Sequence, residues 1–327
     1  MPTITDELVS EYRMLTQDCG LLDRSERGKL ALTGEEAKSF LAGQVTNDIV
    51  GLEGGAGCYA AFLTHKGKML GDVRVLAVED PAQELLLDTE RATLQALFDL
   101  VRRFKIGFDV ELHKRTVQRG LLSLIGPCAR DVAGAQDLPA EEHAHRAGEI
   151  AGRSVRLIVT DGGIDVLCDA EDADAVRDTL EQAGASAVSE AATEIVRVER
   201  GRPRYGADLD DTTIPQEAGL NARAVSFTKG CYVGQETVAR LFYRGKPNRH
   251  LRGLRLSQPA EAGAQLQLGE RVVGRLSSSV VSPSHGPIAL ALVRREVAVG
   301  ETVDVDTPFG AQGGGATTAE VVELPFS

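Results

Sequence analysis

The chain carries two blocks in which strand-like hydrophobic runs accompany a segment with helical hydrophobic spacing. In the first block, Leu94, Leu97 and Val101 fall on one face of a helix predicted over Glu90–Lys105. In the second block, a helix is predicted over Ala173–Gly184, since the final glycine is a typical helix stop. The repeated strand–strand–helix order predicts an α+β fold with duplicated units and antiparallel sheets, not a doubly wound parallel sheet. The expected strands are Val73–Val78, Glu84–Asp88, Gly107–Leu112, Val117–Ile125, Val155–Thr160 and Ile164–Cys168.

A long irregular segment follows the second block. A helix is predicted over Glu190–Arg200, and the stretch from its end to Phe227 lacks helical or strand periodicity. Because this stretch contains Pro, Gly, Tyr and Leu, it does not have the composition of disorder, and we predict an ordered loop that lines a ligand site. A further helix is predicted to begin near Cys231 and to carry Glu236 and Arg240 as an i,i+4 ion pair.

The pattern changes after Pro247 to short alternating runs separated by turn residues. Such runs at short intervals are typical of a small all-β barrel or sandwich. We therefore predict an α+β core over residues 1–245, with two α+β subdomains, and a β-barrel domain over residues 246–327. The expected barrel strands lie at Leu254–Leu256, Gln265–Leu268, Arg271–Leu276, Ile288–Val293, Thr302–Val305 and Ala319–Leu324.

Composition narrows the class of protein. Of 327 residues, 43% are hydrophobic and 26% are charged, which is ordinary for a globular protein. No apolar run approaches the roughly 18 residues of a membrane span, and the acidic N-terminus lacks a signal-peptide core. We therefore expect a cytoplasmic protein that has no membrane partner.

Charge is distributed unevenly along the chain. The net charge is −12, yet the segment Lys229–Arg255 has seven basic residues and one acid, so it is +6 and the remainder is −18. The acidic remainder disfavours direct nucleic-acid binding. The basic segment indicates a small anionic ligand or an anionic region of a partner, and a solvated surface run explains it equally well.

The strongest candidate for chemistry is Cys231, in the run Lys229-Gly230-Cys231-Tyr232-Val233-Gly234-Gln235-Glu236. A neighbouring lysine and a helix N-terminus both favour the thiolate, which is the form that attacks electrophiles and binds metals. The other cysteines lie in apolar or small-residue surroundings and are expected to fill the core. Because the five cysteines are widely spaced and form no CxxC pair, neither a disulfide framework nor a complete metal site is predicted.

Glu217 is the second candidate, on the predicted loop. A carboxylate on an ordered loop can accept two parallel hydrogen bonds from a flat pair of donors. A guanidinium offers such a pair, and so does the N–H and amino edge of a 2-amino-4-oxopyrimidine, as in pterins. A glutamate that merely caps the loop is the alternative.

Several common site signatures are absent from the sequence. The chain has no GxGxxG, GxxxxGK[ST], GxSxG or HExxH pattern, so nucleotide-phosphate loops, nucleophile elbows and zinc-protease sites are not supported. His143 and His145 lie in a polar stretch, where a solvent-exposed pair is favoured over a metal-ligand pair.

The run Phe227–Glu236 resembles the signature of the YgfZ-type folate-binding proteins, relatives of the aminomethyltransferase (T-protein) of the glycine cleavage system. The likeness covers about residues 20–300 with matching order and spacing. Cysteine at position 231, where the aminomethyltransferases have the aspartate of a KGD pattern, favours the YgfZ branch. The other matching segments are Leu41–Asp48, Gly67–Asp72, Pro203–Gly206 and Pro215–Gly219.

The resemblance implies an aminomethyltransferase-like three-domain cloverleaf around a cavity for tetrahydrofolate or a one-carbon derivative, with a small C-terminal β-barrel. It implies that Glu217 holds the pterin, and we expect Tyr205, Gln235 and Arg240 to be among the folate-binding residues. Asp72 falls where the aminomethyltransferases carry their acid, but Gly71 replaces one of the two adjacent acids that are usual there. Cys231, Lys229 and Asp72 are thus the candidate catalytic residues, and no metal ligand is predicted.

Three functions are compatible with these sequence features. The first is a tetrahydrofolate-binding accessory factor for iron–sulfur cluster assembly or repair, whose partners are client or assembly proteins and whose reactive group is the Cys231 thiolate. The second is a folate-dependent aminomethyltransferase or demethylase that uses Asp72 as its acid. The third is a non-catalytic module that supports tRNA-modifying enzymes without binding nucleic acid directly.

Overall fold

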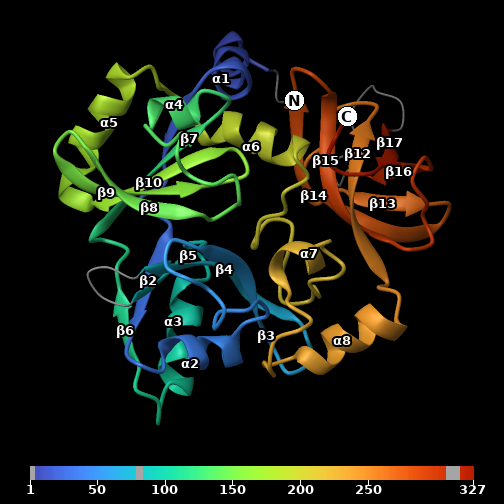
Figure 1. The fold of residues 1–327 in the computed structure, drawn as a ribbon. Helices are drawn as coiled ribbons and strands as arrows, with labels where there is room; N and C mark the ends of the chain where they lie inside the picture. Colours follow the sequence, from blue (N-terminus) through green and yellow to red (C-terminus); the bar gives the residue numbers. More distant parts are fainter. Residues whose placement is uncertain (1–3, 79–83, 307–316) are drawn as a thin grey trace. The chain divides into compact units, whose positions relative to one another are not determined.

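The computed structural model describes residues 4–78, 84–306 and 317–327, and its chain forms two compact units (Figure 1). The first unit combines Met1–Tyr12, Ser189–Leu220 and Val238–Ser327, and the second combines Arg13–Val188 with Asn221–Thr237. Each unit therefore contains segments that are distant in sequence. Among the described residues, no helix is both long and apolar enough to cross a membrane.

The second unit contains a five-stranded sheet in the order β3-β4-β5-β2-β6. Helices α2 (Ala37–Gln44) and α3 (Leu94–Phe104) bury their apolar sides against it (Figure 1). The α3 residues Leu97 and Val101, spaced one helical turn apart, are fully buried in this core. The strands are β2 (Gly28–Thr33), β3 (Gly57–Leu63), β4 (Met69–Val78), β5 (Glu84–Thr89) and β6 (Glu111–Lys114).

The second unit also contains a six-stranded sheet in the order β11-β1-β7-β10-β9-β8. Its pairs are antiparallel except for the parallel pair β1–β11. Helices α4 (Ala129–Val132) and α5 (Ala173–Gln182) contribute to its core, and a 3-10 turn (Ala170–Asp172) precedes α5. The strands are β1 (Gly20–Asp23), β7 (Arg119–Ile125), β8 (His145–Ile150), β9 (Arg153–Val159), β10 (Gly163–Asp169) and β11 (Ser186–Ala187).

Buried charges connect the two sheets of the second unit. Arg74 on β4 donates to Asp165 on β10 (2.6 Å) and pairs with Asp88 on β5 (2.8 Å). Asp88 also accepts from Arg27 (2.8 Å), and Asp165 also accepts from Ser123 (2.6 Å). These contacts satisfy both buried carboxylates and tie the facing sheets together, because an unpaired charge at this depth would be costly.

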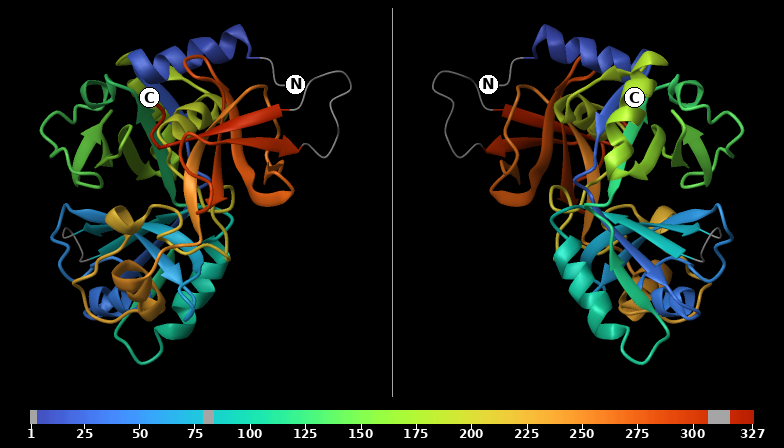
Figure 2. Two further views of the ribbon diagram at one scale, coloured as in Figure 1. Left: turned by 90° about the vertical axis from the view of Figure 1, so that its right-hand side faces the viewer. Right: turned by 90° about the vertical axis from the view of Figure 1, so that its left-hand side faces the viewer.

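The first unit is built on a closed barrel with strand order β12-β15-β14-β13-β16-β17 (Figures 1 and 2). Inward-facing residues alternate along the strands and form one apolar core. Helix α6 (Glu190–Glu199) packs on the barrel through the buried Val198. The barrel strands are β12 (Arg249–Leu256), β13 (Gln265–Leu268), β14 (Arg271–Ser282), β15 (Gly286–Arg294), β16 (Thr302–Asp306) and β17 (Thr317–Val322).

The predicted α+β class and C-terminal barrel are confirmed, while several element boundaries differ. Helix α3 begins at Leu94 and not at Glu90, and the strand predicted from Gly107 begins at Glu111. Gly107 has φ +94°, which ends the helix in a turn and precludes strand geometry there. The sequence patterns did not predict α1 (Asp6–Gln17), and they also missed α2, α4, α7 (Asn221–Ala224), β1, β2, β3, β8 and β11.

Candidate functional site

Glu217 lies on the loop that follows α6, in the first unit, and is only 6% exposed. One carboxylate oxygen, Oε2, accepts a hydrogen bond from the backbone N–H of Ile214 (3.1 Å), which fixes the side chain to its own loop. The backbone carbonyl of Glu217 accepts from the N–H of Leu251 on β12 (2.8 Å). The loop is therefore attached to the barrel. It is ordered, as the sequence analysis predicted.

Both oxygens of the Glu217 carboxylate face the guanidinium of Arg249. Arg249 Nη2 donates to Oε2 (2.9 Å), and Nε donates to Oε1 (3.2 Å). These hydrogen bonds raise the pKa of Arg249. The carboxylate thus holds the kind of flat donor pair predicted for it, and the donor in this structure is the chain's own arginine.

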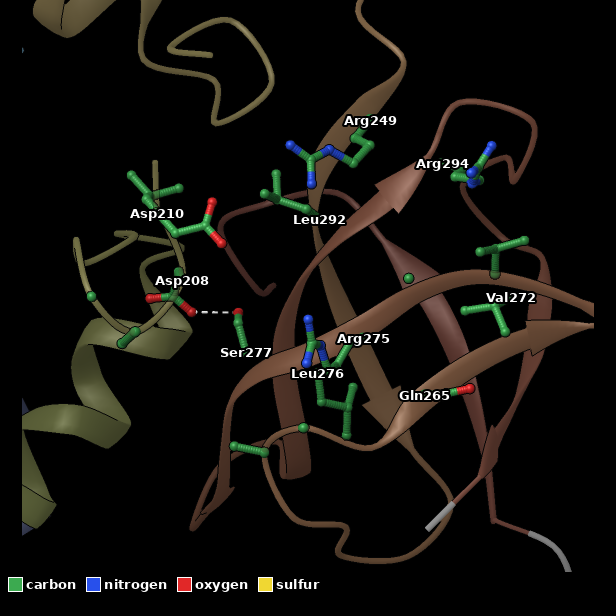
Figure 3. Close-up of a pocket in the computed structure, with 17 residues that line it drawn as sticks. Asp208, Asp210, Arg249, Gln265, Val272, Arg275, Leu276, Ser277, Leu292 and Arg294 are labelled. Atoms are coloured by element: carbon green, nitrogen blue, oxygen red, sulfur yellow. Dashed lines mark hydrogen bonds between the residues drawn. The ribbon is translucent and has the colours of Figure 1, made fainter. Parts of the chain in front are cut away.

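Arg249 also lines a pocket of about 850 Å³ in the first unit (Figure 3). One wall is the loop 206–210, and the other is formed by barrel strands β13, β14 and β15. Ser277 on β14 connects the walls, since its hydroxyl donates to Asp208 (2.6 Å). The volume lies within the range of small-molecule sites. Arg249, which pairs with Glu217, therefore lines a cavity large enough for a cofactor.

In the second unit, Asp72 lies on β4 and is buried. Its Oδ2 accepts a hydrogen bond from the Tyr59 hydroxyl (2.5 Å). Burial raises the pKa of Asp72, whereas the bond from Tyr59 acts in the opposite direction. Burial also raises the pKa of Tyr59 well above its ordinary value, so this residue remains the donor.

Arg223 extends this polar group. Its guanidinium lies over the Tyr59 ring (4.4 Å to the centroid) and pairs with Glu142 (2.5 Å). The stacked cation orients the ring that donates to Asp72. The arrangement can hold a proton near Asp72 and keep its carboxyl in one orientation.

Cys231 is solvent-exposed and lies in an irregular segment of the second unit. The prediction that a helix begins near Cys231 is wrong, because α8 spans Gln235–Arg244. Gly234, with φ +84°, separates the cysteine from the helix. The effect of a helix N-terminus falls off within its first turn, so the helix gives Cys231 little electrostatic support.

The residues flanking Cys231 are anchored. The Lys229 ammonium donates to the carbonyl oxygens of Ala42 and of Val45 (2.7 Å), at the C-terminal end of α2. Burial lowers the pKa of Lys229 to about 8. No hydrogen bond or ion pair joins Lys229 to Cys231 within the described chain. Lys229 therefore holds the segment in place and does not contact the thiol.

Gly234 completes this anchoring. A Cβ at this position would lie 2.5 Å from the Thr64 carbonyl oxygen, so only glycine allows the segment to approach the β3–β4 turn. The Val233 N–H also donates to Gly43 (3.2 Å). Three segments that carry the resemblance, at 41–48, 67–72 and 227–236, thus meet in the second unit and present Cys231 outward.

The predicted site residues fall into two groups. Glu217, Tyr205 and Arg240 belong to the first unit, whereas Cys231, Lys229, Asp72 and Gln235 belong to the second. Tyr205 pairs with Leu209 in an isolated bridge beside the pocket loop. Gln235 is the first residue of α8, Arg240 is exposed on the same helix, and no ion pair joins Arg240 to Glu236 in the described part of the chain.

The remaining cysteines are less exposed than Cys231. Cys19 and Cys168 are fully buried, and Cys58 and Cys128 are half-buried. Burial raises the pKa of Cys58 to about 12, so it stays a thiol. Within the described ranges, no three His, Cys, Asp or Glu side chains are arranged to hold a metal ion.

The expectation that His143 and His145 form an exposed pair is wrong, since both are buried. His145 Nδ1 accepts from Arg156 (2.9 Å), so its Nε2 donates to the Ala56 carbonyl (3.2 Å). His143 has φ +73°, and neither ring nitrogen has a hydrogen-bond partner in the described structure. Burial lowers the pKa of each histidine to about 4.

This burial predicts an acid-sensitive fold. The folded-state pKa values lie below the ordinary 6.5, so the unfolded chain binds more protons between pH 6.5 and 4. Stability should therefore fall as pH decreases through that window, by up to about 3 kcal/mol for each histidine. Urea unfolding at several pH values measures this, and the His143→Gln/His145→Gln variant should show a flatter profile. An unchanged slope in the variant would contradict the assignment.

Sequence reasoning missed the partners of both candidate carboxylates. Arg249 was only one of a run of basic residues, and nothing local connects it to Glu217. Tyr59 had a usable signal, because the turn around Gly67 joins β3 to β4 and pairs Ala61 with Asp72. A residue two positions from Ala61 is a diagonal neighbour of Asp72.

The chain matches two protein-family models and is similar to known proteins in sequence and in fold. The GCVT N-terminal domain model matches residues 2–229, and the glycine cleavage T-protein C-terminal barrel domain model matches residues 249–327. An aminomethyltransferase of Thermotoga petrophila is 29% identical over 344 residues, covering 100% of this chain and 91% of that protein. A putative chloroplastic transferase of Arabidopsis thaliana is 28% identical over 296 residues, covering 87% and 68%. The crystal structure of aminomethyltransferase T from Bartonella henselae shares the fold, with a TM-score of 0.85, 23% identity and coverage of 98% of this chain and 89% of that one.

Proposed function

The chain belongs to the family of the GCVT N-terminal domain, and from this premise we propose that it binds tetrahydrofolate through the carboxylate of Glu217. One observation carries the proposal: this buried carboxylate accepts two hydrogen bonds from the planar Arg249 guanidinium. A guanidinium and the 2-amino-4-oxopyrimidine edge of a pterin present similar pairs of donors. The residues present therefore fit the group that the family implies.

Binding in this way exchanges one donor pair for another. The pterin edge would replace Arg249 at Glu217, while the Ile214 N–H holds the carboxylate in place. The released guanidinium would still face the pocket that Arg249 lines. Tetrahydrofolate, when bound, supplies the nitrogen atoms that carry a one-carbon unit. The cost of exchange is small because the carboxylate stays paired before and after binding.

We further propose that the protein is of the YgfZ type and assists assembly or repair of iron–sulfur clusters through Cys231. An exposed thiol on an anchored segment is accessible to a partner protein. Its thiolate would transiently ligate iron of a client cluster or exchange sulfur with a partner. Because clusters usually need about four ligands, the partner must supply the others.

Replacing Cys231 with Ala is expected to abolish rescue of cluster-dependent enzymes in cells that lack this protein, because the exposed thiol is removed. Tetrahydrofolate binding should persist, since Glu217 is untouched. Enzyme activities in extracts measure the rescue, and Cys128→Ala is the matched control because that half-buried thiol is inaccessible by comparison. Full rescue by Cys231→Ala would contradict the proposed role of the thiol.

A one-carbon transferase is the second candidate, favoured by the buried Asp72 and its Tyr59 donor. The relative from Thermotoga petrophila carries the name aminomethyltransferase. In this reading, Asp72 holds or moves a proton beside the reacting amine. Incubation of the purified protein with tetrahydrofolate and an aminomethyl or N-methylated amine donor tests this candidate. Absence of methylenetetrahydrofolate would count against it.

A further inference from the structure

The connection between α3 and β6 exposes three large apolar side chains that no part of the proposed function uses. Ile106 is 82% exposed, Phe104 49% and Phe108 43%. We call residues 103–109 the apolar turn; it lies at the lower end of the second unit in Figure 1. Exposed apolar side chains of this size, gathered on one turn, mark a surface that another molecule covers.

The apolar turn has a fixed backbone. The Asp109 N–H donates to Glu36 Oε2 (2.7 Å), and the Asp109 carbonyl oxygen accepts from the Glu36 N–H (3.3 Å). The Lys105 ammonium donates to the Val110 carbonyl oxygen (2.8 Å), and the Lys105 carbonyl oxygen accepts from the Phe108 N–H (3.0 Å). Because the exposed side chains project from an ordered backbone, covering them costs little conformational entropy.

The charges around the apolar turn balance. From residue 99 to residue 111 the chain carries three cations and three acids, so this segment is neutral although the whole chain is −12. An acidic protein or an anionic membrane would be matched by a surface of predominantly positive sign. A second copy of the same chain requires both signs, because an isologous interface must be complementary to itself. The cations are Arg102, Arg103 and Lys105, and the acids are Asp99, Asp109 and Glu111.

Two of these charges, Arg103 and Asp109, flank the exposed apolar side chains. Arg103 lies in the last turn of α3, before the three apolar residues, and Asp109 directly follows them. Among the described residues, no hydrogen bond or ion pair engages the side chain of either one, whereas Arg102 pairs with Asp99 (3.0 Å). A two-fold axis through the turn would place Arg103 of each copy opposite Asp109 of the other.

We propose that the protein forms a symmetric dimer through the apolar turn. Phe104, Ile106 and Phe108 of the two copies pack together, and two Arg103–Asp109 ion pairs lie at the rim of the contact. The apolar side chains supply the affinity, while the ion pairs fix the orientation. Because the contact is small, the dissociation constant is expected to be on the order of 10 µM. The inference is independent of folate binding and of the exposed cysteine.

Sedimentation velocity of the full chain, over a concentration series that spans this constant, measures the dimer. Ile106→Asp should leave only monomer, because it would bury two like charges between the copies. Val117→Asp is the matched control, since Val117 is also 82% exposed but follows β6, whereas the apolar turn precedes that strand. The control should dimerise as the wild type does, and circular dichroism shows whether each variant is folded.

A charge exchange tests the orientation of the two copies. Arg103→Glu and Asp109→Arg should each weaken the dimer by at least about tenfold, since each change replaces two attractions with two repulsions. The double variant Arg103→Glu/Asp109→Arg should dimerise about as tightly as the wild type, because both ion pairs are restored with opposite polarity. Recovery of this kind is expected only if the two residues face each other across the contact.

Three results would overturn the proposal. The first is a wild type that stays monomeric throughout the series, and the second is a dimer that persists in Ile106→Asp. The third is weakening by both single charge changes without recovery in the double variant. Vesicles of phosphatidylcholine and phosphatidylserine test the other occupant: a monomeric wild type that cosediments with them, and an Ile106→Asp variant that does not, would assign the apolar turn to a membrane and not to a second copy.

Discussion

Replacing Glu217 with Gln is expected to weaken tetrahydrofolate binding by at least about a hundredfold, the loss of two hydrogen bonds to a charged acceptor. The glutamine offers one acceptor and one donor where the pterin edge needs two acceptors. Its amide oxygen can still accept from the Ile214 N–H, so the loop should keep its conformation. The change therefore removes recognition without removing the loop's own hydrogen bond.

Equilibrium dialysis with labelled tetrahydrofolate measures the effect. Glu323→Gln is the matched control, because Glu323 is an exposed glutamate of the same unit that pairs with Arg252 at 3.2 Å. The control should bind as the wild type does. If Glu217→Gln also binds with unchanged affinity, the pterin is held elsewhere and Glu217 serves only to pair Arg249.

Replacing Arg74 with Ala is expected to lower the stability of the second unit by about 3–5 kcal/mol. The change leaves Asp165 and Asp88 without the guanidinium that pairs with both, between two packed sheets. Asp88 keeps Arg27 and Asp165 keeps Ser123, so the carboxylates retain partial compensation. The free energy of unfolding, from urea titration followed by circular dichroism, measures this loss.

Arg102→Ala is the matched control for that experiment. Arg102 is 65% exposed on α3 and pairs with Asp99 at 3.0 Å, three residues earlier. Exposed pairs of this kind contribute at most about 1 kcal/mol. Equal losses in the two variants would show that the bridge between the sheets is no stronger than a surface ion pair.

Local patterns predicted the parts of the fold that local physics determines. Alternating residues gave the barrel strands, and helical spacing gave α3 and α5, because each element buries one face. The helix boundary near Cys231 was missed because a glycine at φ +84° separates the signature from α8. A residue sequence shows that glycine, but not the backbone angle it adopts.

The candidate site was predictable residue by residue but not pair by pair. The Glu217 carboxylate was expected to accept a flat donor pair, and the structure supplies Arg249 from a barrel strand 32 positions later. That contact depends on how the loop attaches to β12, which no local pattern encodes. For Lys229 the sequence suggested the wrong neighbour. Its position beside Cys231 suggested that the ammonium contacts the thiol, but the ammonium donates to carbonyl oxygens at the end of α2.

Calorimetric titration of the wild-type chain with tetrahydrofolate, under reducing anaerobic conditions, tests directly whether the Glu217 carboxylate recognises the pterin. We expect saturable binding of one molecule per chain in the wild type, with the heat lost in Glu217→Gln while circular dichroism shows that the variant is folded. Absence of saturable binding by the wild type, or equal binding by the variant, would contradict the claim that this carboxylate recognises the pterin.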